Sequence, residues 1–300
     1  MPYVSEDGSH WYDRRTGQPV DVVPMKTRPG EVKVPTAKDA REYGLLPGCT
    51  SVTRMLKEGG LDRWIIDQHI KAALRLTRAP GEADNEFAKR IVVEARDYSE
   101  KAANFGSRMH SNIELYLKDK WGIGEGYTVS DDTLPSDWPY LWEVQKWLDA
   151  HEIRPEDEGS PMGLEFSFAN AEYGYGARVD CRGMIDIGEG TRRRAYIDWK
   201  TQATTPGKPF NHWPGHGMQL ISHLRGASTE ETEEKDKDTV LLNILISSTE
   251  PGRIEPFLWL DQDRQWEGFR HCLGLYYMYG PGKALKSDLD SLEMDEVDAT

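Results

Sequence analysis

Four charged side chains stand at polar positions in the segment from Gly163 to Gln202, where apolar and polar residues alternate. They are Glu165, Asp180, Asp198 and Lys200. Carboxylates brought together repel one another, and a hard divalent cation such as Mg²⁺ relieves that repulsion through oxygen coordination. Such a cation lowers the pKa of a bound water and stabilises a leaving oxygen, while a nearby lysine can orient the water. The residue types therefore suit phosphodiester hydrolysis.

The segment that carries these residues is predicted to be a three-stranded meander. It breaks at AEYG and at EGT, and the pieces between the breaks alternate as strands do. Successive strand side chains point to opposite faces, so we expect the apolar residues to share one face and the charged residues to share the other. The apolar set is Leu164, Phe166, Phe168, Val179, Cys181, Ile197 and Trp199.

The spacing acid-x-Lys is weak by itself, because the chain contains it three times. The copies are Glu31-x-Lys33, Glu233-x-Lys235 and Asp198-x-Lys200. Only the third ends an apolar strand and follows a second acid-bearing strand. The alternative interpretation is a solvated cross-strand face without a ligand. Because Glu165 and Asp180 are in phase with this pair, we favour the metal site.

The sequence GYGARVD followed by AYIDWKTQ resembles the PD-(D/E)XK nuclease superfamily, in the RecB-like branch common among bacteriophage exonucleases. In that branch a G-x-x-D strand precedes a D-[WYF]-K-T strand and a helix with Q-x-x-x-Y. Here Gln219 matches, and His223 stands where the family usually has tyrosine. FGSRMHSNIELYL resembles the family's G-x-x-x-H helix and places His110 as a candidate metal ligand. LPGCTSVTRMLKEGGLDRW resembles the opening of the phage proteins, so the resemblance runs from about Thr50 to Gly226.

The resemblance implies an α/β fold with a restriction-endonuclease-like αβββαβ core, a central mixed sheet and a helical N-terminal part. It implies one or two Mg²⁺ or Mn²⁺ ions and a product with a 5′-phosphate. Lys200 would handle the attacking water and Gln219 the scissile phosphate. The implied metal ligands are Asp180 and Asp198, with help from Glu165, His110 and the carbonyl of Ile197.

The function we expect from this resemblance is a deoxyribonuclease, most specifically a phage-type exonuclease for DNA recombination or repair. The substrate would be single- or double-stranded DNA, and a single-strand annealing or recombination protein is a candidate partner. Two alternatives stay open, namely an endonuclease or nickase on the same core and a catalytically silent DNA-binding module. The complete set of Glu165, Asp180, Asp198, Lys200 and Gln219 argues against the silent module.

A second G-x-x-D occurs at Gly183 to Asp186, on the same expected face as Asp180. Six residues along a strand span roughly 20 Å, at about 3.3 Å per residue, so both aspartates cannot contact one pair of metal ions. We favour Asp180, because its surroundings match the family better, and we expect Asp186 near the hairpin tip.

The formal net charge of −14 would repel DNA at long range, so contact with DNA requires local basic patches. Much of the negative excess lies in 230–238 and 288–298, which we expect to be a solvated loop and a disordered tail. The loop after Lys200 carries His212, Trp213 and His216, which either contact nucleotides or form a plain connector. The candidate DNA-binding arginines are Arg178, Arg182, Arg192, Arg193 and Arg194, of which the last three could instead serve only to solubilise a turn.

The three cysteines, Cys49, Cys181 and Cys272, are too far apart in sequence for a disulfide framework or a C-x-x-C site. We expect a reduced, cytoplasmic compartment, which would be the bacterial host's for a phage protein. Some RecB-like relatives hold an iron–sulfur cluster on four cysteines, so we expect no cluster here. The N-terminus lacks the apolar core of a signal peptide, and no stretch approaches the roughly 18 apolar residues of a membrane span.

The chain is expected to divide into an N-terminal extension (1–50), a helical part (51–160), a nuclease core (161–280) and an acidic tail (281–300). Apolar spacing predicts separate helices over 85–104 and 107–118, and another over 138–151. The nearly continuous apolar run from Thr239 to Ser248 predicts a strand covered on both faces.

Overall fold

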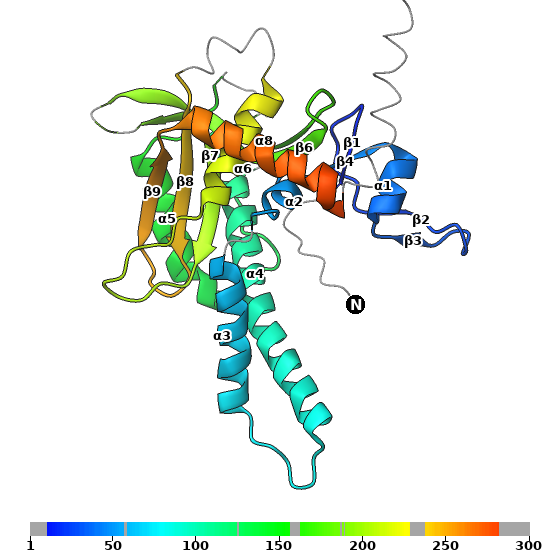
Figure 1. Cartoon of the computed structure of the whole chain (residues 1–300). Coiled ribbons are helices and arrows are strands. Elements are labelled where there is room, and N and C mark those ends of the chain that lie inside the picture. The colour runs from blue at the N-terminus through cyan, green and yellow to red at the C-terminus, as the bar shows by residue number, and fades with distance from the viewer. Residues whose placement is uncertain are drawn as a thin grey trace, which may run out of the picture.

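The structure is a computed structural model that describes residues 11–56, 59–124, 126–156, 163–186, 188, 190–228 and 238–281. The acidic tail expected at 288–298 and nearly all of the acidic stretch at 230–238 lie outside the described residues. The model is a mixed α/β fold around one five-stranded sheet, with a helical arm below it (Figure 1). No described helix combines the length and the apolar character that crossing a membrane requires.

The central sheet has the strand order β5-β6-β7-β8-β9. The first three strands form consecutive antiparallel pairs, which confirms the predicted meander. Strand β8 pairs parallel with β7, because the chain crosses over through a helix between them, and β9 returns antiparallel. Every residue of β8 is buried, as its apolar run predicts. The strands are β5 (Leu164–Asn170), β6 (Tyr175–Asp186), β7 (Arg192–Gln202), β8 (Val240–Ser247) and β9 (Ile254–Trp259).

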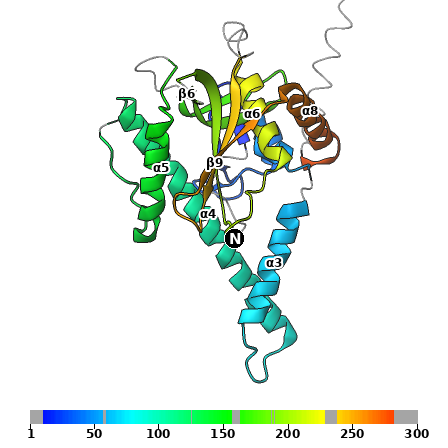
Figure 2. The same cartoon turned by 90° about the vertical axis from the view of Figure 1, so that its left-hand side faces the viewer.

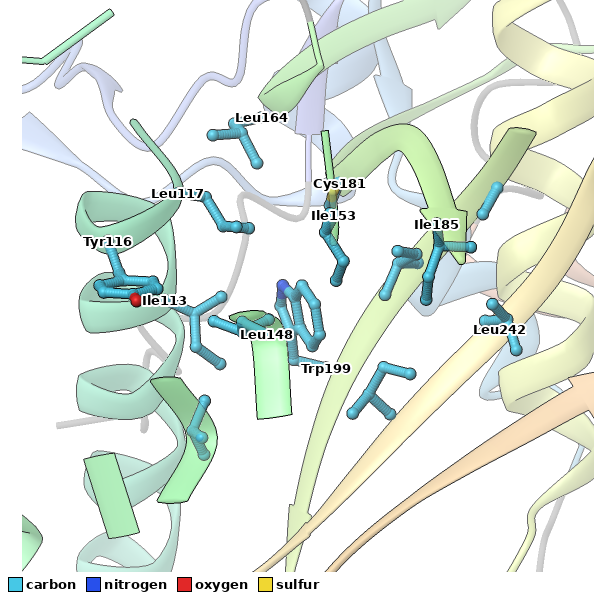
Figure 3. Packing of buried hydrophobic residues seen from close by; sticks show 14 of the residues in the cluster. Ile113, Tyr116, Leu117, Leu148, Ile153, Leu164, Cys181, Ile185, Trp199 and Leu242 are labelled. Carbon is cyan, nitrogen blue, oxygen red and sulfur yellow. The ribbon is translucent and has the colours of Figure 1, made fainter. Parts of the chain in front are cut away.

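Helices cover both faces of the sheet (Figures 1 and 2). On one face, α4 (Asp84–Lys120) and α5 (Trp138–Ala150) enclose a core that contains Leu117, Leu148 and Trp199 (Figure 3). On the other face, α6 (Pro214–Ala227) and α8 (Gln262–Tyr279) enclose a second core. Its part between α6 and the sheet, around Val179, Leu220 and Leu241, is called the α6 core. Each fully buried aliphatic or aromatic side chain contributes about 1.5–3 kcal/mol. The two cores therefore hold the sheet rigidly between two helical layers.

In strands β5 and β6, the apolar residues switch from one face of the sheet to the other between two neighbouring pairs. Leu164 and Cys181, which pair with each other, lie in the α4–α5 core. Phe166 and Val179, the next pair in register, pack in the α6 core instead. Glu165 lies between them with a φ of 50°, in the left-handed region that residues other than glycine seldom adopt. The prediction that the apolar residues of these strands share one face is therefore wrong.

The N-terminal part forms a small layer beside the sheet. The elements are β1 (Trp11–Asp13), β2 (Val23–Pro24), β3 (Val32–Lys33), α1 (Ala37–Tyr43), β4 (Leu45–Pro47) and α2 (Cys49–Thr53). Strand β1 pairs with β4. Helix α1 begins at a capping box, in which the side chains of Thr36 and Asp39 each accept a hydrogen bond from the other residue's backbone N–H. That helix ends at Gly44, whose φ of 65° is left-handed.

The arm consists of α3 (Gly59–Arg75) and the first half of α4, and it projects away from the sheet (Figures 1 and 2). Helix α4 is one continuous element of 37 residues. The prediction of two separate helices over 85–104 and 107–118 is therefore wrong. After α4, the short 3-10 helix η1 (Pro135–Asp137) leads into α5. A partly buried ion pair between Arg108 of α4 and Asp137 of η1 (2.7 Å) ties these two helices together.

Candidate metal centre

The site lies at a fork where β6 and β7 separate. Their register runs from the hairpin end to the pair Cys181–Ile197 and stops there, while β7 continues beside β8. Beyond the fork, side chains rather than strand β6 provide the hydrogen-bond partners of the Trp199 backbone N–H and C=O. Its N–H donates to Asp180 Oδ2 (3.0 Å), and its carbonyl oxygen lies 2.8 Å from His110 Nε2. The fork thus draws side chains from α4 and β6 to one point.

Three of the predicted residues meet at this point. Ligand atoms of His110, Glu165 and Asp180 all lie within 4.8 Å of one another. A backbone carbonyl can only accept, so His110 Nε2 carries the proton that faces Trp199. In the neutral imidazole, Nδ1 is then the unprotonated nitrogen, and it lies 3.5 Å from Asp180 Oδ2. A histidine held through its other N–H by a carbonyl is the usual arrangement of a metal-ligating histidine.

Glu165 stands in an unfavourable environment for a negative charge. Burial and the neighbouring Asp180 raise its pKa to about 8, and the adjacent Arg178 guanidinium opposes that rise. Arg178 Nε lies 2.5 Å from the Glu165 carboxylate, and half-buried Glu114 adds further negative charge. Burial first, and then repulsion from Asp180, therefore favour the protonated form of Glu165. One imidazole nitrogen and two carboxylates are donors that Mn²⁺ and Mg²⁺ accept, so the residues fit such a cation.

Asp198 and Lys200 form a second group beside this cluster. Asp198 is 1% exposed, and its Oδ1 accepts from Lys200 Nζ at 2.8 Å. Its Oδ2 accepts from Asn243 Nδ2 at 2.6 Å, and Lys200 Nζ also donates to Gln219 Oε1 at 3.2 Å. Burial, aided by Asp180, raises the pKa of Asp198 to about 6, although Lys200 opposes the rise. All five side chains predicted to carry chemistry are thus assembled around the fork, together with His110.

The backbone carbonyl next to the cluster is not that of Ile197. Ile197, whose carbonyl was expected at the metal, pairs with Cys181 inside the β6–β7 ladder and is fully buried. The carbonyl that contacts the cluster is that of Trp199. The difference between Ile197 and Trp199 follows from the fork, because only backbone groups beyond the last β6–β7 pair are open to side chains.

The predicted basic patch is largely neutralised by acids. Arg194 and Arg182 both approach Glu156, and Arg192 binds Glu152. Arg193 donates to the carbonyl of Asp238, and Arg178 pairs with Glu165 as described. Arg178 is 42% exposed beside the cluster, whereas the Arg182 side chain is 16% exposed and also stacks on Phe166. Of this set, Arg178 is thus the exposed one that adjoins the site.

The remaining candidates take structural positions. Asp186 ends β6 opposite Arg192, at the hairpin end as expected. His223, at the family's tyrosine position, is fully buried with Nε2 3.5 Å from Cys49 Sγ, and burial lowers its pKa to about 4. His212 stacks on Phe257, Trp213 precedes α6, and burial lowers the pKa of His216 to about 3.

Sequence reasoning missed Asn243 and Trp259. Trp259 Nε1 donates to Asn243 Oδ1 at 2.7 Å, so Asn243 joins β9 to Asp198. The signal for Asn243 was present, because it interrupts the apolar run of β8 as a single amide. A polar group in a fully buried strand requires a partner.

Comparison with known proteins gives no family. No protein-family model matches the chain, and no curated protein matches it. Among solved structures, the crystal structure of SSO0001 is 14% identical in sequence, with alignment over 74% of this chain and 87% of that one. Its TM-score is 0.25, which is too low to carry an argument. The function must therefore be argued from the site.

Proposed function

We propose that this chain is a metal-dependent deoxyribonuclease that hydrolyses phosphodiester bonds on a PD-(D/E)XK core. The observation that carries the proposal is the cluster of His110, Glu165 and Asp180 at the strand fork, next to the Asp198–Lys200 pair. Asp180 contributes to the raised pKa of both Glu165 and Asp198, and such repulsion between acids is costly unless a cation offsets their charge. The cluster is therefore better explained as a cation site than as a structural feature.

The order of elements supports the same core. The long helix α4, followed by η1 and α5, precedes three antiparallel strands, and the crossover helix α6 then leads to the parallel strand β8. This order corresponds to the αβββαβ arrangement that the sequence resemblance implies. The residues of the resemblance lie on the corresponding elements, with His110 on α4, Asp180 on β6, Asp198 and Lys200 on β7 and Gln219 on α6.

A bound divalent cation would supply Lewis-acid chemistry, namely a lower pKa of the attacking water and charge stabilisation at the leaving oxygen. The chain's own residues do the positioning. Lys200 brings a positive charge to the scissile phosphate and orients the water. A lysine ammonium can only donate, so Gln219 turns its Oε1 toward Lys200 and its amide N–H groups elsewhere. Those N–H groups are suited to a phosphate oxygen, and Arg178 offers a second contact.

The specific form we propose is an exonuclease of bacteriophage type, acting in DNA recombination or repair. A digestion series with Mn²⁺ or Mg²⁺ tests it on end-labelled linear duplex, end-labelled single strand and closed circular DNA. Cleavage restricted to linear substrates is expected, and the labelled end gives the polarity. Cutting of the circle would instead favour the endonuclease or nickase.

Asp180→Asn and Asp186→Asn form a matched pair of variants for this assay. Both aspartates lie on β6, but only Asp180 lies in the cluster. Asp180→Asn should abolish cleavage and the increase in melting temperature with Mn²⁺, whereas Asp186→Asn should retain both. A wild-type protein that neither cuts DNA nor gains stability from Mn²⁺ would refute the proposal and favour the silent DNA-binding module.

A further inference from the structure

The central residue of β8 is a fully buried amide. Asn243 is 1% exposed and lies between Leu242 and Ile244, where a polar side chain without partners would be costly. It has a partner on each side of the amide, because Nδ2 donates to Asp198 Oδ2 at 2.6 Å and Oδ1 accepts from Trp259 Nε1 at 2.7 Å. A buried chain of hydrogen bonds therefore runs from β9 through β8 to Asp198.

The direction of this chain is fixed by chemistry. An indole N–H can only donate, so the oxygen of the Asn243 amide must face Trp259. The amide NH₂ then has to face Asp198, whose carboxylate can only accept when ionised. Asp198 Oδ2 is thereby held from behind by Asn243, while Oδ1 faces Lys200.

Trp259 itself is fixed by packing. Its indole lies so close to Gly217 on α6 that a Cβ at position 217 would be 2.7 Å from the ring, which requires glycine there. Phe257 contacts the same indole edge-to-face, with ring centroids 4.8 Å apart. The ring also packs against the α6 core. The hydrogen-bond donor at the start of the chain is thus held in place by the helix that carries Gln219.

We propose that Trp259 and Asn243 are positioning residues that hold the Asp198 carboxylate in the orientation the cation requires. The inference rests on the proposed function, because it assumes that Asp198 takes part in cation binding. Partners that orient metal ligands typically change metal affinity by about 10–100-fold when they are lost. Asn243→Leu removes the contact to Asp198 directly and should have an effect of that size. Trp259→Phe removes the N–H that orients the amide, together with part of the packed indole ring, and a drop of about 3–10-fold is expected.

The experiment measures Mn²⁺ affinity by titration calorimetry on the full chain, for wild type, Trp259→Phe, Asn243→Leu and the double variant. Because Trp259 acts only through Asn243, the double variant should bind Mn²⁺ as weakly as Asn243→Leu alone. Trp266→Phe is the matched control, since its indole packs against the same α6 core but belongs to α8. It should lower the melting temperature and leave the Mn²⁺ affinity unchanged. Trp259→Phe keeps the test available if Asn243→Leu does not fold.

Three results would overturn the inference. These are unchanged Mn²⁺ affinity in Trp259→Phe, losses that add in the double variant, and an equal loss in Trp266→Phe. The test also separates the two proposals. A wild type that binds Mn²⁺ but cuts no DNA would refute the nuclease while the affinities still decide the role of Asn243. A wild type that binds no Mn²⁺ would refute both.

Discussion

Glu165→Gln is the substitution that tests most directly whether the folded site disfavours a negative charge on Glu165. Burial and Asp180 raise the pKa of Glu165 from its ordinary value of 4.5 to about 8. In the metal-free folded protein the carboxyl therefore keeps its proton at pH values where the unfolded chain has lost it. The stabilisation from this group is complete below about pH 4.5, declines as the pH rises, and is lost above about pH 8.

The size of this effect follows from the shift. One pH unit within the window is worth about 1.4 kcal/mol, so the free energy of unfolding should lose about 3–4 kcal/mol between pH 5 and pH 8 through Glu165. Glutamine does not titrate, so Glu165→Gln should remove this decline. Relative to wild type, the variant should gain stability steadily as the pH rises. Loss of the ion pair with Arg178, which is 42% exposed, should offset less than about 1 kcal/mol of that gain.

The assay is urea unfolding in EDTA at pH 5, 6, 7 and 8, on wild type and Glu165→Gln. Asp186→Asn is the control, because it removes one carboxylate from β6 outside the cluster. Added Mn²⁺ at pH 8 should stabilise wild type more than Glu165→Gln. A stability difference between wild type and Glu165→Gln that stays constant from pH 5 to pH 8 would show that burial and Asp180 do not raise the pKa of Glu165 as argued.

Three further substitutions test the folded framework. Burial lowers the pKa of His223 to about 4, so the unfolded chain gains protons first as the pH falls, and stability should drop by about 3 kcal/mol between pH 6.5 and pH 4. Acid unfolding of His223→Phe should lack this drop, and an unchanged pH profile would contradict the neutral buried histidine. Gly183→Ala would place a Cβ 2.4 Å from the carbonyl oxygen of Arg154, so urea unfolding should show a loss of more than about 2 kcal/mol, and near-wild-type stability would contradict that contact. Leu117→Ala in the α4–α5 core should lower the free energy of unfolding by about 2–5 kcal/mol in the same measurement. Leu74→Ala is the control, because that position is 82% exposed on the arm, and it should change stability by less than about 0.5 kcal/mol. Similar losses in both variants would refute the assigned core.

The strands were predictable because burial imposes a period on them. Alternation over 163–202 marks the meander, and the unbroken apolar run of β8 marks a strand covered on both faces. The helix boundaries were less predictable. The two predicted helices left Gly106 in the gap between them, yet it lies buried inside α4, where a Cβ would be 3.0 Å from Thr201 Oγ1. That glycine serves close approach of α4 to β7, which a single sequence does not distinguish from a break.

The residues of the candidate site were predictable by type, but their geometry was not. Glu165, Asp180 and His110 do lie together, although not because the charged residues share one face of the sheet. The left-handed conformation at Glu165 depends on pairing between β5 and β6, and no local pattern marks it. The contact between Asn243 and Trp259 likewise arises only when β8 and β9 pair.

The length of α4 has a mechanical consequence. The helix begins at Asp84 at the tip of the arm, and His110 follows 26 residues later, about 39 Å along the axis at 1.5 Å per residue. No proline interrupts this span, and its Gly106–Ser107 pair, a sequence at which helices can kink, lies inside the continuous helix close to His110. A tilt of about 5° about the level of His110 would move the tip by about 3 Å. The arm and the imidazole thus belong to one continuous helix, and a displacement of the arm would be transmitted along that helix to the imidazole.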